Sequence, residues 1–337
     1  MTADEPLLEA MLHRARTGDG QAFAELVQPY RRELHVHCYR MLGSFDDADD
    51  ALQETLLAAW RGLTAFQARA SVRTWLYRVA TNTCLNQLRT AARRPQPAMS
   101  MPASGPAPTG SDTVTWLQPY PDLLLDGLPD NDPGPEARVE RSEAVSLAFI
   151  TALQLLSPRA RAVLVLRDVL GFTAREVAGT LDSTEEAVAM TLSRARAALR
   201  KNEPRPGGPA DTTLAQRLAA ALTAHDIDQV VSLLTEDVRI AMPPLPATWS
   251  GTTRAAEFLV EVAFRLVPEA RFIETQANRQ PALAVYSRDG STGLWHGSGL
   301  LVITPRGSQV CALTRFESHT LTAFGMPSVL DDGGQLG

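Results

Sequence analysis

The stretch LSPRARAVLVLRDVLGFTAREVAGTLDSTEEAVAMTLSRARAALRK, residues 156–201, decides the fold of the middle of the chain. The Ser-Pro pair at 157–158 is a typical helix start, because proline at the first helical position loses no hydrogen bond. Residues 173–176 and 183–186 each have the Ser/Thr-x-x-Glu spacing of a capping box. With a tight turn at 181–182, these starts predict a short helix, then a longer helix to Lys201, which is a helix-turn-helix.

The longer helix has two different faces. Its apolar stripe, Val188, Leu192, Ala195 and Leu199, is expected to pack on the earlier helices. The opposite face is small, polar and basic, which suits a major groove, and it consists of Ala189, Met190, Ser193, Arg194 and Arg200. From this pattern alone, an ordinary three-helix bundle with a solvated arginine face stays an alternative to DNA binding.

Length and charge set wider bounds. A chain of 337 residues predicts two or three domains, and its net charge of −6 is unevenly spread. Acidic residues gather in 101–150, whereas basic residues outnumber acidic ones in 151–205, so nucleic acid is not excluded. Three scattered cysteines, Cys38, Cys84 and Cys311, predict neither a disulfide framework nor a metal site. No apolar run has the length of a membrane span and no signal peptide is recognisable, so we expect a cytoplasmic protein.

Residues 5–92 have helical patterns almost throughout. One helix begins with an acidic segment, SFDDADDALQE at 44–54. Acid at a helix start complements the positive end of the helix dipole, and it equally suits a basic partner surface. Further on, Trp75, Arg78, Asn82, Asn86 and Arg89 share one helical face. Such a face suits single-stranded DNA, although Trp75 and Tyr77 also fit a helical core, and for Trp75 the core is favoured.

These segments resemble a known family. YRMLGS at 39–44, DDALQE at 49–54 and RTWLYRVATN at 73–82 look like region 2 of the extracytoplasmic-function group of sigma-70-type factors. Residues 141–201, ending in SRARAALR at 193–200, resemble region 4 of the same group. Together the two matches cover roughly half of the chain in the right order, which is more specific than either motif alone.

The resemblance implies roles for three surfaces. The residues implied to bind core RNA polymerase are Asp46, Asp47, Asp49, Asp50, Gln53 and Glu54. Those implied to bind and open the −10 element are Phe66, Arg73, Trp75, Arg78, Asn82 and Asn86. Those implied to read the −35 element are Ala189, Met190, Ser193, Arg194 and Arg196. Ala189 and Met190 depart from the longer polar residues common in this group, so the −35 sequence stays open.

Residues 96–140 are rich in proline and glycine and predict a flexible linker. The linker contains WLQPYPD at 116–122, similar to a linker motif of sigma factors in this group that carry an extra C-terminal domain. Trp116 and Tyr120 are therefore expected to dock on another part of the protein. The acidic residues after them could follow a channel that normally takes nucleic acid, or could simply be solvated.

After a second linker, residues 206–337 predict helices followed by an antiparallel strand meander, an α+β cone. With MPPLP at 242–246 and FGMP at 324–327, the segment resembles SnoaL-like domains. Some such domains are enzymes that use an Asp/His pair. The candidates for such a pair in this segment are Asp237, Trp295, His296, Glu317 and His319. Their spacing in the sequence does not identify any two of them as a pair, so we expect no enzyme and no cofactor.

The predicted organisation is two all-α sigma domains and an α+β SnoaL-like cone. Region 2 is expected at 1–95, the linker at 96–140, the region 4 helix-turn-helix at 141–205 and a regulatory cone at 206–337. The predicted function is a sigma factor with core RNA polymerase and promoter DNA as partners and with no membrane. A small ligand in the cone is left open. The alternatives are a one-component helix-turn-helix regulator with a ligand-binding cone and a fused SnoaL-type enzyme.

Overall fold

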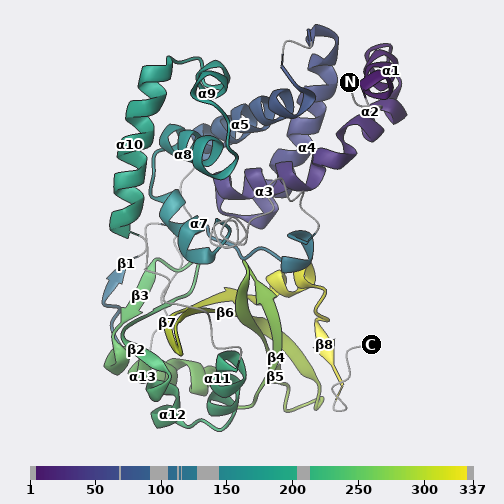
Figure 1. Cartoon of the computed structure of the whole chain (residues 1–337). Helices are drawn as coiled ribbons and strands as arrows, with labels where there is room; N and C mark the ends of the chain where they lie inside the picture. The colour runs from purple at the N-terminus through teal and green to yellow at the C-terminus, as the bar shows by residue number, and fades with distance from the viewer. Residues whose placement is uncertain are drawn as a thin grey trace. The chain divides into compact units, whose positions relative to one another are not determined.

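The computed structural model describes residues 5–67, 70–91, 105–111, 114, 116–126, 144–202 and 213–331. The chain forms two compact units. The first unit contains helices α1 to α5 and α8 to α10, and the second contains β1, α7 and every element from α11 onward (Figure 1). Within the described ranges, no helix combines the length and apolar character needed to cross a bilayer.

The first unit is all helical, as predicted. Its elements are α1 Glu5–Arg16, α2 Gly20–Val27, η1 Gln28–Tyr30, α3 Arg31–Leu42, α4 Phe45–Gly62, η2 Leu63–Ala65, α5 Val72–Ala91, α8 Pro158–Leu164, the π-turn η4 Val165–Val169, α9 Ala174–Thr180 and α10 Glu185–Asn202. Gly43 ends α3 in the left-handed region at φ 79°, which costs glycine little. Ser44 then caps α4, because its hydroxyl accepts a hydrogen bond from the Asp47 N–H at 3.1 Å. This Gly-Ser turn sets the start of the acidic helix.

The helix-turn-helix prediction is confirmed by α9 and α10. Thr173 and Glu176 form the predicted capping box at the start of α9. The second predicted box, at residues 183–186, is wrong: the hydroxyl of Thr184, not Ser183, accepts from the Ala187 N–H at 3.2 Å, so the helix starts one residue later. Asp182 before it adopts φ 46°, and this left-handed residue makes the tight turn.

His37 is fully buried in the first unit and lacks a partner for one ring nitrogen. The Thr81 hydroxyl donates to the Tyr77 carbonyl at 2.7 Å, so the His37 Nε2–H must donate to Thr81 Oγ1, 2.9 Å away. Nδ1 is buried with no hydrogen-bond partner. Burial therefore lowers the pKa of His37 to about 3, with smaller contributions from the Arg40 and Arg73 charges.

Because of His37, we expect the stability of the protein to decrease at acidic pH. Below pH 6.5 His37 is protonated in the unfolded chain but stays neutral in the folded protein until the pH reaches about 3. Between these pH values the free energy of unfolding therefore falls as the pH drops. The expected loss is about 2 kcal/mol between pH 6.5 and 5. His37→Gln, which keeps a donor for Thr81, should reduce this loss in urea unfolding at both pH values. Burial also lowers the pKa of His35, so some pH dependence remains. Equal pH dependence in variant and wild type would contradict the assignment.

The second unit is the α+β fold predicted for the C-terminal part. Its elements are β1 Gly110–Ser111, η3 Asp122–Leu124, α7 Leu147–Gln154, α11 Leu214–Thr223, α12 Ile227–Ser232, β2 Leu234–Ala241, β3 Ala247–Ser250, α13 Thr252–Phe258, the π-turn η5 Leu259–Ala263, α14 Phe264–Leu266, β4 Ala270–Ala277, β5 Gln280–Arg288, β6 Trp295–Arg306, β7 Gln309–Glu317, η6 Ser318–Phe324 and β8 Val329–Leu330. The short strands β1, β3 and β8 were not predicted from the sequence.

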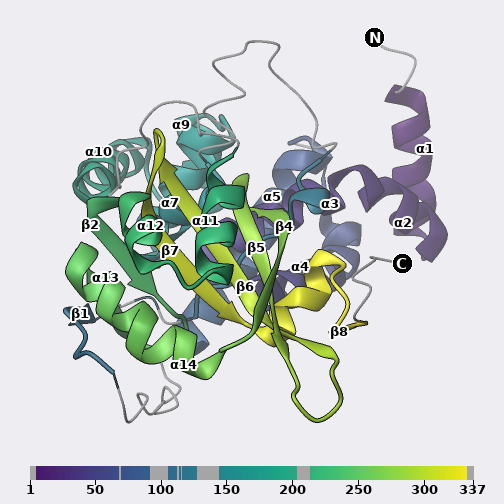
Figure 2. The same cartoon turned by 90° about the horizontal axis from the view of Figure 1, so that it is seen from below.

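One curved sheet organises this unit, with strand order β1-β3-β2-β7-β6-β5-β4 and β8 paired with β6. Neighbouring strands are antiparallel except β2 and β7, which are parallel. Helices α11, α12 and α13 cover one face of the sheet (Figure 2). The core lies between these helices and the sheet, and its members include Leu214, Leu218, Val230, Ile240, Trp249, Phe258, Leu283 and Leu313.

Candidate polymerase- and nucleic-acid-binding surfaces

The acidic surface lies on α4, and its side chains are exposed. Ala48, Ala51, Leu52 and Thr55 turn into the bundle, which leaves the remaining positions of these turns toward solvent. The residues so exposed are Asp46, Asp47, Asp49, Asp50, Gln53 and Glu54. Partial burial raises the pKa of Asp47, the hydrogen bond with Ser44 opposes that shift, and the Asp50 and Asp46 carboxylates add to it, as crowded like charges should. We call these six residues the acidic face.

The residues predicted to bind the −10 element do not all share one environment. Arg78, Asn82 and Asn86 are exposed along α5, as the helical spacing predicted. Phe66 is only 8 % exposed, and its ring packs on that of half-buried Trp75 with centroids 4.8 Å apart. Phe66 therefore packs in the core of the first unit, and its assignment to the −10 element stays a prediction.

Arg73 lies in a polar cluster rather than in solvent. Its guanidinium pairs with Glu33 at 3.0 Å, and the Tyr77 hydroxyl donates to the same carboxylate at 3.1 Å. The guanidinium also lies over the Phe172 ring, 5.5 Å from its centroid. Because Phe172 precedes α9, the helix-turn-helix segment reaches the predicted −10 residue directly.

Three further contacts join α5 and the segment 172–182. The rings of Tyr77 and Phe172 meet edge to face at 5.3 Å. The Thr74 hydroxyl lies 3.5 Å from Glu176, and Arg78 lies 3.5 Å from Asp182. We call this set, with the Arg73 contact, the α5–α9 contact. It covers part of the surface assigned to the −10 element.

The outer face of α10 carries the predicted −35 residues. Ala189, Ser193 and Arg194 are exposed, and Met190 is 55 % exposed. Arg196 is also exposed, but it makes a bidentate ion pair with Asp168 of η4 at 2.6 and 2.8 Å, which raises the pKa of Arg196. Arg194 has no ion-pair partner among the described residues, so it is the better placed of the two to contact DNA.

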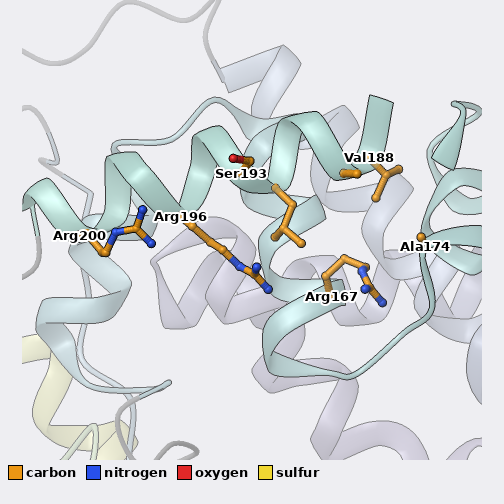
Figure 3. Close-up of a pocket in the computed structure, with 8 residues that line it drawn as sticks. Arg167, Ala174, Val188, Ser193, Arg196 and Arg200 are labelled. Atoms are coloured by element: carbon orange, nitrogen blue, oxygen red, sulfur yellow. The ribbon is translucent and has the colours of Figure 1, made fainter. Parts of the chain in front are cut away.

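Beside this face lies a basic groove of about 360 Å³ that the sequence did not predict. Figure 3 shows Arg167 and Arg196 reaching into it from η4 and α10. Its lining residues are Arg167, Ala174, Val188, Ala189, Leu192, Ser193, Arg196 and Arg200. Arg167 was not predicted to belong to this groove, because it precedes the helix-turn-helix and its sequence neighbours do not indicate that it faces α10.

A variant of the α10 face gives a direct prediction. Arg194→Ala should weaken binding to a −35 duplex by about 1–3 kcal/mol if the guanidinium contacts a base edge, and by less if it contacts phosphate. Fluorescence anisotropy at several salt concentrations measures this change. Arg265→Ala, an exposed arginine of α14, removes the same charge elsewhere and should leave the affinity unchanged. Unaltered binding by the Arg194 variant would remove this residue from the interface.

The second unit holds the linker through the turn between β4 and β5. Asn278 and Arg279 occupy this turn with φ of 57° and 58°. The Asn278 side chain accepts from the Tyr120 N–H at 2.8 Å and donates to the Val145 carbonyl at 2.7 Å. The Asp122 carboxylate accepts from the Arg279 N–H at 2.8 Å. We call this set of contacts the linker clamp.

The two residues predicted to dock, Trp116 and Tyr120, differ in how much of their surface is exposed. Tyr120 is fully buried, whereas Trp116 keeps 37 % of its surface exposed. Earlier linker residues also pack on this unit, since β1 pairs with β3 and Trp249 Nε1–H donates to the Pro106 carbonyl at 2.9 Å. The linker was predicted to be flexible, and its described residues 105–111 and 116–126 belong to the second unit.

Of the acidic and histidine residues considered for a pair, only the side chains of Glu317 and His319 lie within 4 Å of each other. Asp237 pairs with Arg306 at 2.8 Å, and the nearby Thr235 hydroxyl and this guanidinium lower the pKa of Asp237. His296 is 3.9 Å from Asp289, and His319 is 3.6 Å from Glu317. Of the residues considered, the pocket of this unit includes only Glu317 in its lining. In the described part of the chain, no group of three acidic, histidine or cysteine residues could hold a metal ion.

The chain is similar to known sigma factors. Residues 26–94 match Sigma-70 region 2, and residues 146–199 match Sigma-70 region 4. The ECF RNA polymerase sigma factor SigG of Mycobacterium tuberculosis is 40 % identical over 331 residues, covering 94 % of this chain and 86 % of SigG. SigJ of the same species is 30 % identical over 297 residues, covering 84 % of this chain and 88 % of SigJ.

A solved structure agrees with this assignment along most of the chain. The crystal structure of SigJ from Mycobacterium tuberculosis superposes with a TM-score of 0.58 and 25 % sequence identity, covering 88 % of this chain and 97 % of that chain. The match therefore includes the C-terminal unit as well as the helical one. The chain belongs to the extracytoplasmic-function RNA polymerase sigma factors.

Proposed function

We propose that this sigma factor binds core RNA polymerase through the acidic face of α4 and promoter DNA through α5 and α10. The observation that supports it best is the exposure of all six residues of the acidic face, which extends beyond the first turn of α4, where acid complements the helix dipole. Charge of one sign on one helix suits a basic partner and speeds association with it. Because core polymerase is an intracellular enzyme, we place this function in the cytoplasm.

For promoter binding, regions 2 and 4 must reach two DNA elements at once. Elements separated by roughly two helical turns lie about 70 Å apart. The α5–α9 contact instead joins the two regions and occupies Arg73 and Arg78. We therefore propose that this contact opens when the chain binds polymerase and DNA. Its exposed ion pair, Arg78–Asp182, contributes little stability, whereas exposing the buried rings of Tyr77 and Phe172 has a cost that new contacts with polymerase and DNA must offset.

We further propose that the C-terminal unit regulates this step without catalysing a reaction. Its linker clamp binds Tyr120 on the linker and Val145 just before α7, the first helix of the segment that matches region 4. A linker fixed at both points has fewer conformations than a free one, so it limits how far the two regions separate. Asp237, His296 and His319 do not line the pocket of this unit, whereas His225 and Glu317 do, so the linker clamp is the observation that supports the regulatory role.

Selection of DNA from a random pool tests the function. The chain with core polymerase should enrich sequences that contain two short blocks about two helical turns apart, and the chain alone should enrich neither block strongly. A one-component repressor would instead select an inverted repeat without polymerase. That second outcome would overturn the proposed function, and so would a selection that is independent of polymerase.

A further inference from the structure

The second unit contains an apolar pocket that the regulatory proposal does not use. It has a volume of about 300 Å³, enough for roughly ten non-hydrogen atoms. Its walls come from α13, η5, α14 and the β2–β3 loop, with the sheet as its floor. Packed interiors rarely leave voids larger than one water molecule, so a space of this size is suited to a ligand.

The lining is mostly hydrophobic, and its polar residues are His225, whose ring packs on that of Phe264 with centroids 4.4 Å apart, Arg315 and Glu317. Side chains such as Met242, Phe264 and Phe272 make up the wall, and Leu266 at the rim is 71 % exposed. The charged residues in the lining are Arg315 and Glu317, both on β7. A ligand that fills this space must therefore be apolar over most of its length and polar at one end.

Arg315 is held in place by a bulge in the neighbouring strand. Its Nη2 donates to the carbonyl and the hydroxyl oxygen of Ser298, each at 2.8 Å. The β5–β6 pairing shifts register at Ser298, and Gly299 beside it adopts φ 157°. A Cβ on Gly299 would lie 2.2 Å from the Phe316 carbonyl oxygen, so only glycine fits there. Bulges of this kind often orient a functional side chain.

The charge of Arg315 is not neutralised by an ion pair within the described residues. By contrast, Arg279, Arg288 and Arg306 of the same unit each pair with a carboxylate within 3.2 Å. Burial lowers the pKa of Arg315, and the negative charge of Glu317 opposes that shift without coming into ion-pair contact. A guanidinium that is desolvated but bound only by neutral oxygens gains most from an added anion.

We propose that this pocket binds a small apolar carboxylic acid whose carboxylate meets the Arg315 guanidinium. Medium-chain fatty acids and aromatic acids of about ten to twelve non-hydrogen atoms have the right size and polarity. The inference does not depend on polymerase or promoter binding. Glu317, at the exposed end of β7, favours ligands with one acidic group over ligands with two.

Calorimetric titration of the full chain with three ten-carbon probes tests this proposal. Decanoate should bind at least tenfold more tightly than decanol, and decyltrimethylammonium should bind most weakly. Arg315→Gln should remove the preference for decanoate while decanol binding stays, and Arg306→Gln is the matched control outside the pocket. Ala263→Phe, which fills the pocket, should abolish binding of all three probes.

Circular dichroism checks that each variant is folded, and Arg315→Lys provides a second variant if Arg315→Gln is not. Arg315→Lys keeps the charge and loses the planar fork, so it should retain part of the preference for decanoate. The proposal is overturned if no probe binds to wild type. It is equally overturned if decanoate binds as tightly to the Arg315 or Ala263 variant as to the wild type. Neither result bears on the DNA selection, so the two proposals can fail separately.

Discussion

Reversing two charges of the acidic face, Asp49→Lys with Asp50→Lys, should weaken binding to core RNA polymerase by roughly 100-fold, or about 3 kcal/mol. A basic partner surface that attracted two carboxylates would then meet two ammonium groups, and like charges placed together cost several kcal/mol. The fold should survive, because both side chains are exposed. Asp49 lies 3.9 Å from His35, but burial lowers the pKa of His35, so no ion pair is lost at neutral pH.

The matched control carries the same change in net charge elsewhere in the first unit. Glu9 and Glu25 are exposed on α1 and α2, so Glu9→Lys with Glu25→Lys should leave the affinity for polymerase near that of wild type. Biolayer interferometry with immobilised core polymerase measures all three proteins. If the α4 and control variants lose affinity equally, only net charge matters and the acidic face is not the binding surface.

Loosening the linker clamp with Asn278→Gly should raise transcription several-fold. Glycine tolerates the φ of 57° at this turn, so the turn persists while the side chain is removed. Two buried hydrogen bonds, to the Tyr120 N–H and the Val145 carbonyl, disappear. Each contributes about 1 kcal/mol, so the released state becomes roughly 30-fold more populated. Multiple-round transcription with core polymerase measures the change.

Asp126→Asn is the control for this prediction. It removes the ion pair between Arg279 and Asp126, which lies next to the clamp but is exposed on the Asp126 side, and such pairs contribute little. Its transcription should match that of wild type. If Asn278→Gly transcribes no more than wild type, the clamp does not restrain the protein. If it transcribes less, the C-terminal unit stabilises the active arrangement instead.

Local sequence patterns predicted the helical part of this fold well. The helix-turn-helix followed from capping residues and apolar spacing, both of which act within one turn of the helix. The error at residues 183–186 shows the limit of that approach. Ser183 and Thr184 both suit an N-cap, and the left-handed Asp182 decides between them, which is a backbone property that the sequence alone does not specify.

Contacts between distant segments could not be predicted in the same way. The burial of Phe66 depends on Trp75, and the occupation of Arg73 depends on Phe172, which is about one hundred positions away. The aromatic motif indicated that Tyr120 docks, but nothing in the sequence marked Asn278 as its partner. A two-residue turn that contains arginine at a positive φ looks ordinary in sequence, and its role appears only when β4 and β5 are paired.

Run-off transcription tests the account most directly. Purified core polymerase is incubated with each template that the DNA selection yields, with and without the full chain, and the transcripts are sequenced. We expect transcripts that depend on the chain and start a fixed distance downstream of the two selected blocks. They should be lost in the Asp49/Asp50 variant and increased in the Asn278 variant. A chain that binds these templates without polymerase and yields no transcript from any of them would contradict the account.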